Sequence, residues 1–208
     1  MQLQNYYYWF KDAIPHHVCD DIVKYAKSLQ DQMAVTGGLG HKKLNTKEVQ
    51  DLKKKRDSDI IWLDERWIYN AIHPYIHQAN KDANWNFHWD YSEHCQFTKY
   101  KKGQYYDWHC DSWDRPYHKP EEPNTHGKQR KLSVTLSLSE DKDYNGGELE
   151  FDMRNTDPDK KANTHVLKEI RSKGSLVVFP SDVWHRVKPV KRGVRHSLVI
   201  WNLGWPFK

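Results

Sequence analysis

The second half of the chain alternates apolar and polar residues with a period of two, most clearly over residues 132–139. There, Leu132, Val134, Leu136 and Leu138 alternate with Ser133, Thr135, Ser137 and Ser139. Because successive side chains of a strand point to opposite faces, this alternation predicts a strand with one apolar and one polar face. Further short strands are predicted at 96–101, 106–111, 148–153, 165–170, 175–180, 184–189 and 194–201, separated by turns such as Asn145-Gly146-Gly147. Such a series predicts a β-sandwich or barrel, and its strand number and spacing fit a jelly roll.

The first 92 residues instead predict helices. Apolar side chains recur at helical spacing over residues 15–31 and 63–82, and we expect these two helices to pack together on the outside of the β structure. Between them, residues 34–56 hold few large apolar side chains, and Gly37-Gly38-Leu39-Gly40 is followed by a lysine-rich run. We expect a long mobile loop here, which is either a lid over an active site or a surface excursion.

The length of 208 residues suits one domain. We expect a mainly β fold with N-terminal helices, in which residues 1–92 support a β core over 93–208. The hydrophobic content of 37% suffices to bury a core and excludes a disordered composition. The formal net charge of +5 permits an anionic ligand but does not by itself indicate nucleic-acid binding.

Cysteine content and the lack of long apolar runs bear on the compartment. The three cysteines, Cys19, Cys95 and Cys110, have no repeated spacing, which argues against a disulfide framework and fits a reducing compartment. The sequence holds no apolar run long enough for a transmembrane helix, and its first residues lack the features of a signal peptide. We therefore expect a cytoplasmic protein without membrane partners, in the cytoplasm of the host cell if the chain is encoded by a phage.

A candidate metal site begins at His109-Cys110-Asp111. On a strand, His109 and Asp111 project from the same face, which brings an imidazole and a carboxylate side by side. His185, on a later predicted strand, is the candidate third ligand. Two histidines and one carboxylate on one face leave three coordination positions open, which suits iron(II) that must bind a cosubstrate and O₂ together. A His-x-Asp pair alone is weak evidence in a chain with thirteen histidines.

Arg195 and Ser197 alternate onto one face of the last predicted strand. A guanidinium inside a β fold needs a carboxylate, because an unpaired buried charge is very costly. If Asp111 binds the metal, the partner of Arg195 is a carboxylate of a ligand, which the planar guanidinium can bind through two hydrogen bonds. Ser197 could add a hydroxyl to the same group. The alternative is an ordinary surface arginine in a basic strand.

Three ordered motifs support a family resemblance. Residues 100–111 read YKKGQYYDWHCD, residues 130–151 contain RKLSVTLSLS and YNGGELEF, and residues 174–201 contain GSLVVFPS, HRV and GVRHSLVIW. Together they resemble the prolyl 4-hydroxylase-type subfamily of 2-oxoglutarate/iron(II) oxygenases, including the small microbial and phage members labelled PKHD-type hydroxylases. The resemblance covers residues 95–208 and, more loosely, the helices before them.

The resemblance implies a double-stranded β-helix and an oxygenase that uses Fe(II), 2-oxoglutarate and O₂, with ascorbate as a further expected cofactor. The implied reaction hydroxylates a C–H bond and releases succinate and CO₂. The iron ligands it implies are His109, Asp111 and His185, and it implies that Arg195 and Tyr100 bind the cosubstrate. Ser197 joins them as a cosubstrate-binding candidate because it lies on the same strand face as Arg195. One position departs from the pattern. Some prolyl hydroxylases have a cosubstrate-binding tyrosine on the strand after the metal motif, where this chain offers Thr135, Ser137 or Leu138.

By analogy with the family, the expected substrate is a prolyl residue in a peptide or protein. Tyr106, Trp201 and Trp113 are the expected substrate-binding residues, the last within an insertion over residues 112–129. Two alternatives stay open. One is an oxygenase acting on nucleic acid, a free amino acid or another small molecule, supported by clusters of basic residues. The other is a non-catalytic jelly-roll module that keeps the motif for structure or binds zinc. The sequence does not indicate an oligomeric state.

Overall fold

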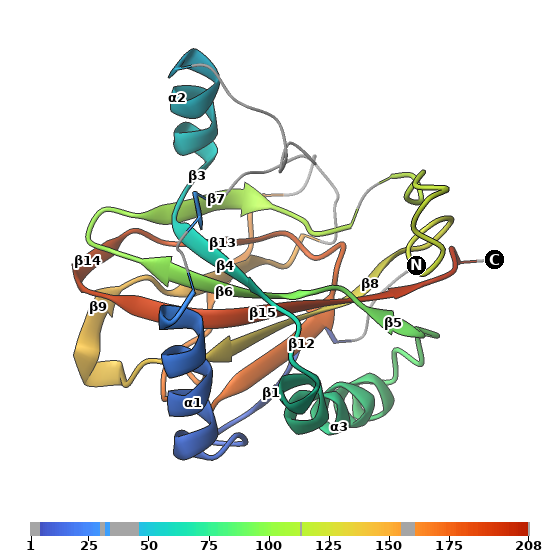
Figure 1. The fold of residues 1–208 in the computed structure, drawn as a ribbon, viewed down its shortest axis with the longest axis horizontal. Helices are drawn as coiled ribbons and strands as arrows, with labels where there is room; N and C mark the ends of the chain where they lie inside the picture. Colours follow the sequence, from blue (N-terminus) through green and yellow to red (C-terminus); the bar gives the residue numbers. More distant parts are fainter. Residues whose placement is uncertain (1–4, 30–31, 34–45, 113, 155–160, 208) are drawn as a thin grey trace.

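The computed structural model describes residues 5–29, 32–33, 46–112, 114–154 and 161–207. Within these ranges the chain is mainly β, and the predicted combination of β structure with N-terminal helices is confirmed (Figure 1). The helical elements are α1 (His16–Lys27), α2 (Thr46–Lys55), α3 (Arg66–Asp82) and the 3-10 helix η1 (Asp141–Asp143).

The larger sheet has the order β1-β12-β8-β15-β6-β4-β2 among the described residues, and β5 also pairs with β15. Its strands are β1 (Tyr8–Phe10), β2 (Gln32–Met33), β4 (Asp59–Leu63), β5 (Tyr91–Ser92), β6 (Cys95–Tyr100), β8 (Gln129–Ser137), β12 (Leu176–Pro180) and β15 (Arg195–Gly204). The central strand β15 pairs antiparallel with both β6 and β8, so the last strand of the chain lies in the middle of the sheet.

A smaller sheet faces the larger one and has the order β11-β10-β13-β7-β3. Its strands are β3 (Arg56–Asp57), β7 (Tyr105–His109), β10 (Leu149–Asp152), β11 (Thr164–Val166) and β13 (His185–Val187). A two-stranded ribbon of β9 (Tyr144–Gly146) and β14 (Val190–Gly193) completes the β structure of the described ranges. Both strands that carry the predicted histidine ligands, β7 and β13, belong to the smaller sheet and pair with each other.

Helices α1 and α3 lie on the same side of the larger sheet (Figure 1). Their buried side chains, such as Ile22 and Ile72, belong to one apolar cluster with Leu132, Val134 and Leu136 of β8. The apolar face of the alternating strand therefore packs towards the helices. Both helices join this one cluster, in keeping with the expectation that they cover the outside of the β structure.

A second apolar cluster lies between the two sheets. It contains Tyr100, Val177 and Phe179 from the larger sheet and Leu149, Phe151 and Val187 from the smaller one. The polar face of β8, with Ser133, Thr135 and Ser137, is buried on the side away from the helix-facing cluster. The interior between the sheets is thus part apolar and part polar, and a polar interior needs hydrogen-bonding partners or a ligand.

The expectation of a loop over residues 34–56 is wrong for its second half. Residues 46–55 form helix α2, and Arg56 begins strand β3. Lysine, glutamate and glutamine are good helix formers even where no apolar stripe exists. Because apolar side chains at helical spacing were the basis for predicting helices, this segment was not predicted as one. A contact from another element holds the end of the helix, since the Tyr105 hydroxyl donates to the carbonyls of Lys53 and Lys54 at 3.2 and 2.8 Å. Residues 34–45, on which the lid interpretation depends, lie outside the described residues.

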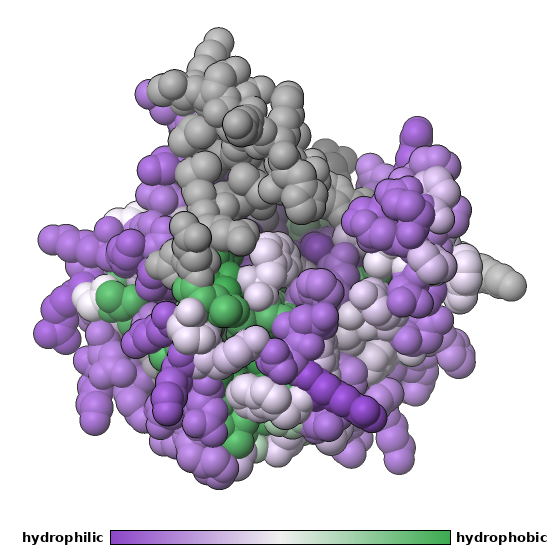
Figure 2. All heavy atoms as spheres, viewed as in Figure 1, coloured by the Kyte–Doolittle hydropathy of each residue, from purple (hydrophilic) through white to green (hydrophobic). Residues whose placement is uncertain are grey.

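Other differences are smaller. The two predicted helices are shorter, and the short strands β1 to β5, β9 and β14 were not predicted. Strand β9 includes part of the predicted turn at residues 145–147, and the strand predicted at 165–170 is limited to β11. No helix in the described part of the chain is long and apolar enough to cross a membrane. Hydrophilic side chains cover most of the face in Figure 2, and apolar side chains are exposed only in small patches.

Candidate active site

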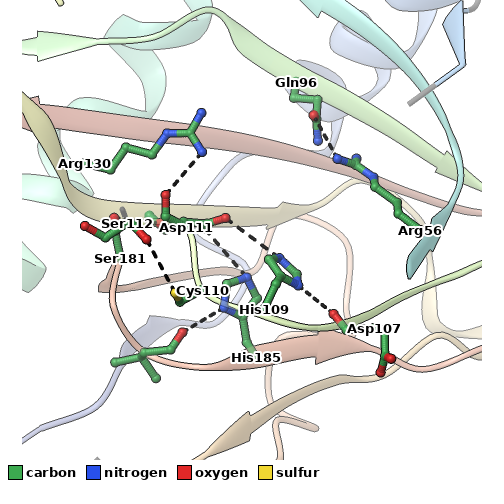
Figure 3. A network of polar contacts seen from close by, with 12 residues as sticks. Arg56, Gln96, Asp107, His109, Cys110, Asp111, Ser112, Arg130, Ser181 and His185 are labelled. Carbon is green, nitrogen blue, oxygen red and sulfur yellow. Dashed lines mark hydrogen bonds and ion pairs between the residues drawn. The ribbon is translucent and has the colours of Figure 1, made fainter. Parts of the chain in front are cut away.

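His109, Asp111 and His185 come together at one end of the smaller sheet (Figure 3). His109 ends β7 and His185 begins β13, and the two residues are directly opposite each other in the antiparallel pair. Strand β7 stops two residues before Asp111, whose backbone N–H instead donates to the Ser181 carbonyl at 2.8 Å. The Nε2 atoms of His109 and His185 lie 3.8 and 3.6 Å from the Asp111 carboxylate oxygens. One ligand atom from each residue lies within 4.8 Å of the others.

Backbone contacts orient both imidazoles in the same way. Nδ1 of His109 lies 2.7 Å from the Asp107 carbonyl oxygen, and Nδ1 of His185 lies 2.9 Å from that of Val183. A carbonyl oxygen only accepts, so Nδ1 carries the proton in both rings and the neutral Nε2 atoms present lone pairs to the Asp111 carboxylate. Acceptors that face one another repel unless a cation lies between them. The donor set and its tautomers therefore fit a divalent metal ion.

Electrostatics favour the forms that bind a metal. Burial, together with the neighbouring His185, lowers the pKa of His109 to about 3, so the ring is neutral at physiological pH. Burial raises the pKa of the Asp111 carboxyl, but His185, His109, Arg130 and a hydrogen bond from Ser133 outweigh that effect, and the pKa lies below its ordinary value. A neutral imidazole and an ionised carboxylate are the ligand forms that metals require.

Arg195 is 3% exposed and lies on β15, opposite Tyr100 of β6. Its Nη1 donates to the Ser197 hydroxyl at 3.3 Å, and its guanidinium carbon lies 5.6 Å from the centre of the Tyr100 ring. Among the described residues, no carboxylate lies within ion-pair distance of Arg195. The predicted alternation of Arg195 and Ser197 onto one buried face is observed, and Arg195 is not a surface residue.

Gly147 is a site residue that the sequence indicated only as part of a turn. Its φ is +65°, and a Cβ atom there would lie 2.9 Å from Val190 and 3.1 Å from the Arg195 side chain. Because Gly147 has no Cβ atom, the Arg195 side chain can pack closely against its backbone. Of the residues considered in place of the missing tyrosine, Leu138 packs in the helix-facing cluster, so it does not line the interior.

Tyr106 stacks on the metal-site residue His109, with ring centres 3.5 Å apart and an angle of 12° between the planes. Arg56, on the neighbouring strand β3, also lies over the Tyr106 ring, with its guanidinium carbon 4.6 Å from the ring centre. Burial raises the pKa of the Tyr106 hydroxyl to about 12, although Arg56 opposes the shift. Arg56 lies in the segment predicted as a loop, and the sequence pattern indicates no role for it.

Trp201 is buried on β15, and the guanidinium of Arg130 lies 3.9 Å above its ring. Arg130 in turn forms an ion pair with Glu93 at 2.6 Å and donates to the backbone carbonyl of Asp111 at 3.5 Å. Trp62 of β4 lies beside Trp201, with ring centres 6.2 Å apart. Arg130, Glu93 and Trp62 had no predicted role. Trp113 lies outside the described residues.

Comparison with known proteins agrees with this site. The model of the family described as the 2OG-Fe(II) oxygenase superfamily matches residues 95–202. This range is more than half of the chain and contains every residue of the His-Asp-His cluster together with Arg195. The chain belongs to the 2OG-Fe(II) oxygenase superfamily, and the cofactors of that family are Fe(II) and 2-oxoglutarate, with O₂ as the second cosubstrate.

Among curated proteins, a PKHD-type hydroxylase of Pseudoalteromonas atlantica is 34% identical over 108 residues, which make up 51% of this chain and 41% of that protein. The PKHD-type hydroxylase PiuC of Pseudomonas aeruginosa is 32% identical over 110 residues, with the same two coverages of 51% and 41%. The match thus spans only about two fifths of the length of these relatives.

Two solved structures show the same fold. The viral collagen prolyl hydroxylase from Paramecium Bursaria Chlorella virus-1 has a TM-score of 0.64 at 18% identity and covers 97% of both chains. A prolyl-4-hydroxylase of Pseudomonas putida has a TM-score of 0.62 at 20% identity, over 96% of this chain and 92% of the other. At these identities the likeness concerns the fold alone.

Proposed function

We propose that the chain is a 2-oxoglutarate- and Fe(II)-dependent dioxygenase that hydroxylates a C–H bond of a prolyl residue in a peptide or protein. Fe(II) with bound 2-oxoglutarate and O₂ supplies the oxidation, in which one oxygen atom enters the C–H bond, the other enters succinate, and CO₂ leaves. The observation that carries the proposal is the His109, Asp111 and His185 cluster, in which both Nε2 atoms face the carboxylate.

His109, Asp111 and His185 hold the metal in this proposal. The backbone carbonyls that accept from the two Nδ1 atoms fix both rings, so that each Nε2 stays unprotonated and directed at the metal position. The register of β7 and β13 fixes the distance between the rings. Residues on two paired strands hold such a geometry more rigidly than residues on loops would.

Arg195 binds the distal carboxylate of 2-oxoglutarate, and Tyr100 and Ser197 complete this part of the site. A buried guanidinium with a single serine partner is costly until an anion binds it. The planar guanidinium matches a carboxylate and holds the cosubstrate in one orientation. The Ser197 hydroxyl, which already contacts Nη1, can turn its own proton to the same carboxylate.

Tyr106 and Trp201 line the substrate side. The Tyr106 ring is stacked on His109, and the Trp201 ring lies beneath Arg130, which contacts the Asp111 carbonyl. Aromatic faces suit the flat, apolar ring of proline. The names of related proteins agree with a prolyl substrate. They include PKHD-type hydroxylases, a viral collagen prolyl hydroxylase and a prolyl hydroxylase of Trichoplax adhaerens solved with a hypoxia inducible factor peptide fragment.

The two facing sheets form a double-stranded β-helix in this proposal, and residues 1–208 make up one oxygenase domain. The helix-facing cluster and the inter-sheet cluster share the strands of the larger sheet, so the helical and β parts stabilise each other. We expect one cooperative unfolding transition, as is usual for a domain of this size.

An anaerobic titration tests the proposal. Fe(II) followed by 2-oxoglutarate should produce the visible metal-to-ligand charge-transfer absorption of a chelated 2-oxo acid. In air, with and without ascorbate, proline-containing peptides should increase succinate formation and gain one oxygen atom by mass spectrometry. If the absorption fails to form, the chain is a non-catalytic or zinc-binding module and the oxygenase proposal is wrong.

A further inference from the structure

Arg56 is a second buried arginine that has no carboxylate partner in the described part of the chain. It is 4% exposed, its Nε donates to Ser58 Oγ at 3.0 Å, and its Nη1 donates to Gln96 Oε1 at 3.3 Å. Its Nη2 is buried and has no hydrogen-bond partner among the residues that the structure describes. Within the described ranges, no aspartate or glutamate lies at ion-pair distance from its guanidinium.

Other arginines near the site are neutralised within the protein. Arg130 pairs with Glu93 and Arg186 with Glu150, each at 2.6 Å. A buried cation that lacks such a partner, and that also has an N–H group without an acceptor, destabilises the folded protein in general. Arg56 and Arg195 both carry this unfavourable free energy of a buried, unpaired charge. A ligand with a negative charge would offset it.

The position of Arg56 is next to the reacting centre. Its guanidinium lies over the Tyr106 ring, and Tyr106 stacks directly on His109, a residue of the candidate metal cluster. Arg56 also has an electrostatic effect on His109 itself. A group bound by Arg56 would therefore lie beside the metal cluster.

Arg56 and Arg195 lie beside different positions along strand β6. Along β6, Gln96 is the partner of Arg56, whereas Tyr100 lies opposite Arg195. Four residues of extended strand separate these two positions by about 13 Å. The anion for Arg56 is therefore a different group from the cosubstrate carboxylate assigned to Arg195.

We propose that Arg56, with Ser58 and Gln96, binds a carboxylate of the substrate. The inference rests on the proposed oxygenase function and deepens it, since it names an acidic group next to the hydroxylated position. The carboxylate is either the α-carboxylate of a free amino acid or chain terminus, or the side chain of an aspartate or glutamate beside the proline. A small planar carboxylate reaches a guanidinium that is almost entirely enclosed more readily than a phosphodiester backbone does.

Matched ligand pairs test the proposal, because each pair differs only in the charge. The pairs are L-proline and L-prolinamide, and capped proline peptides with Asp or Asn, and with Glu or Gln, beside the proline. The dissociation constant of each ligand is measured by calorimetry on the anaerobic protein loaded with Fe(II) and 2-oxoglutarate, and succinate formation is measured in air. In at least one pair, the carboxylate ligand should bind about tenfold or more tightly than its amide. The pair that responds identifies the source of the carboxylate.

Three variants assign the preference to Arg56. Arg56→Gln should bring the two members of the responding pair to similar affinity and leave the charge-transfer absorption with 2-oxoglutarate in place. Lys54→Gln removes the same charge two residues away from a side chain that is 75% exposed, and it should keep the preference. Gln96→Glu should also abolish the preference, because it supplies Arg56 with an internal carboxylate. This variant tests the same assignment if Arg56→Gln does not fold.

Several results would overturn the assignment. They are equal binding within every pair by the wild-type protein, a preference that survives both Arg56→Gln and Gln96→Glu, or tighter binding of a short oligonucleotide than of every carboxylate. Loss of 2-oxoglutarate binding in Arg56→Gln would assign Arg56 to the cosubstrate instead. Failure of the proposed function is a separate result, because it would appear as a missing charge-transfer absorption in the wild-type protein.

Discussion

His109 and His185 lie directly opposite each other on paired strands, and each ring donates its Nδ1 proton to the carbonyl of the residue two positions earlier in the chain. The ring centres are 4.1 Å apart. This shared arrangement leaves both Nε2 atoms directed at the carboxylate of Asp111. The metal site thus depends on strand register as much as on the identity of the three residues.

Asp111→Ala should abolish the charge-transfer absorption with Fe(II) and 2-oxoglutarate and lower iron affinity by at least about 100-fold, because one of three ligands is lost. Iron binding is measured by anaerobic calorimetry. Asp107→Asn is the matched control, since the Asp107 side chain is exposed and only its backbone carbonyl contacts His109. Equal losses in both variants would contradict the assignment of Asp111.

Arg195→Ala should raise the dissociation constant for 2-oxoglutarate by about 10- to 100-fold, the range expected when a charged hydrogen-bonded pair is lost. Iron affinity, measured in the absence of 2-oxoglutarate, should change little. Arg192→Ala removes the same charge from an exposed position on β14 and should leave both affinities unchanged. Turnover at wild-type rates in Arg195→Ala at low 2-oxoglutarate would disprove the role.

Gly147→Ala should destabilise the protein and weaken 2-oxoglutarate binding. The positive φ costs about 1–2 kcal/mol for a residue with a Cβ, and the new methyl group would also crowd Val190 and Arg195. Gly103→Ala isolates the backbone cost, because Gly103 has φ +86° with nothing within 4 Å of the added Cβ. Thermal unfolding and calorimetry should show similar strain in both variants but a loss of cosubstrate affinity only in Gly147→Ala.

His196 should make the stability of the protein depend on pH. Burial, together with the positive charges of Lys27, Lys99 and Arg195, lowers the pKa of His196 to about 4 from the ordinary 6.5. Between these two values the unfolded chain binds more protons than the folded one, so the free energy of unfolding falls as pH drops through this window, by up to about 1 kcal/mol per pH unit. Urea denaturation of metal-free protein between pH 7 and 4, at roughly half-unit steps, measures this slope.

His196→Gln is the control for this effect, because it removes the titrating ring. Its pH slope should be shallower than that of the wild-type protein, and the difference between the two curves isolates His196 from His109, whose pKa is also lowered. Parallel curves would show that His196 does not carry the dependence.

The period-two pattern and the turns between the short runs predicted most of the strands that build the two sheets, because alternation and turn residues are local features of the sequence. Residues 132–139 show this directly, since their leucines and valine face the helices while their serines and threonine lie on the other side. Helix α2 was not predicted, because it has no apolar side chains at helical spacing. Its end is held by Tyr105, which is about fifty residues away in the sequence.

The sequence motifs indicated His109, Asp111, His185 and Arg195. Strand alternation predicts which neighbouring side chains share a face, and the known ligand preferences of metals indicate which residue types can bind iron. The roles proposed for them remain predictions. Arg56 carried no local signal, because it lies next to a lysine-rich helix and looks like a surface charge. Its burial is visible only when β3 pairs with β7 and brings it over Tyr106.

The sequence by itself determined the mainly β class, the N-terminal helices and the residue types of the metal cluster, because alternation, helical spacing and ligand chemistry are local properties. Tertiary structure alone decided which groups are buried without a partner. The register between β7 and β13 sets the distance between the two histidines of the candidate metal cluster. The pairing of β3 with β7 and of β15 with β6 places Arg56 and Arg195 where no carboxylate of the described residues reaches them. A missing charge partner depends on every element packed around a residue, and no stretch of sequence contains that information.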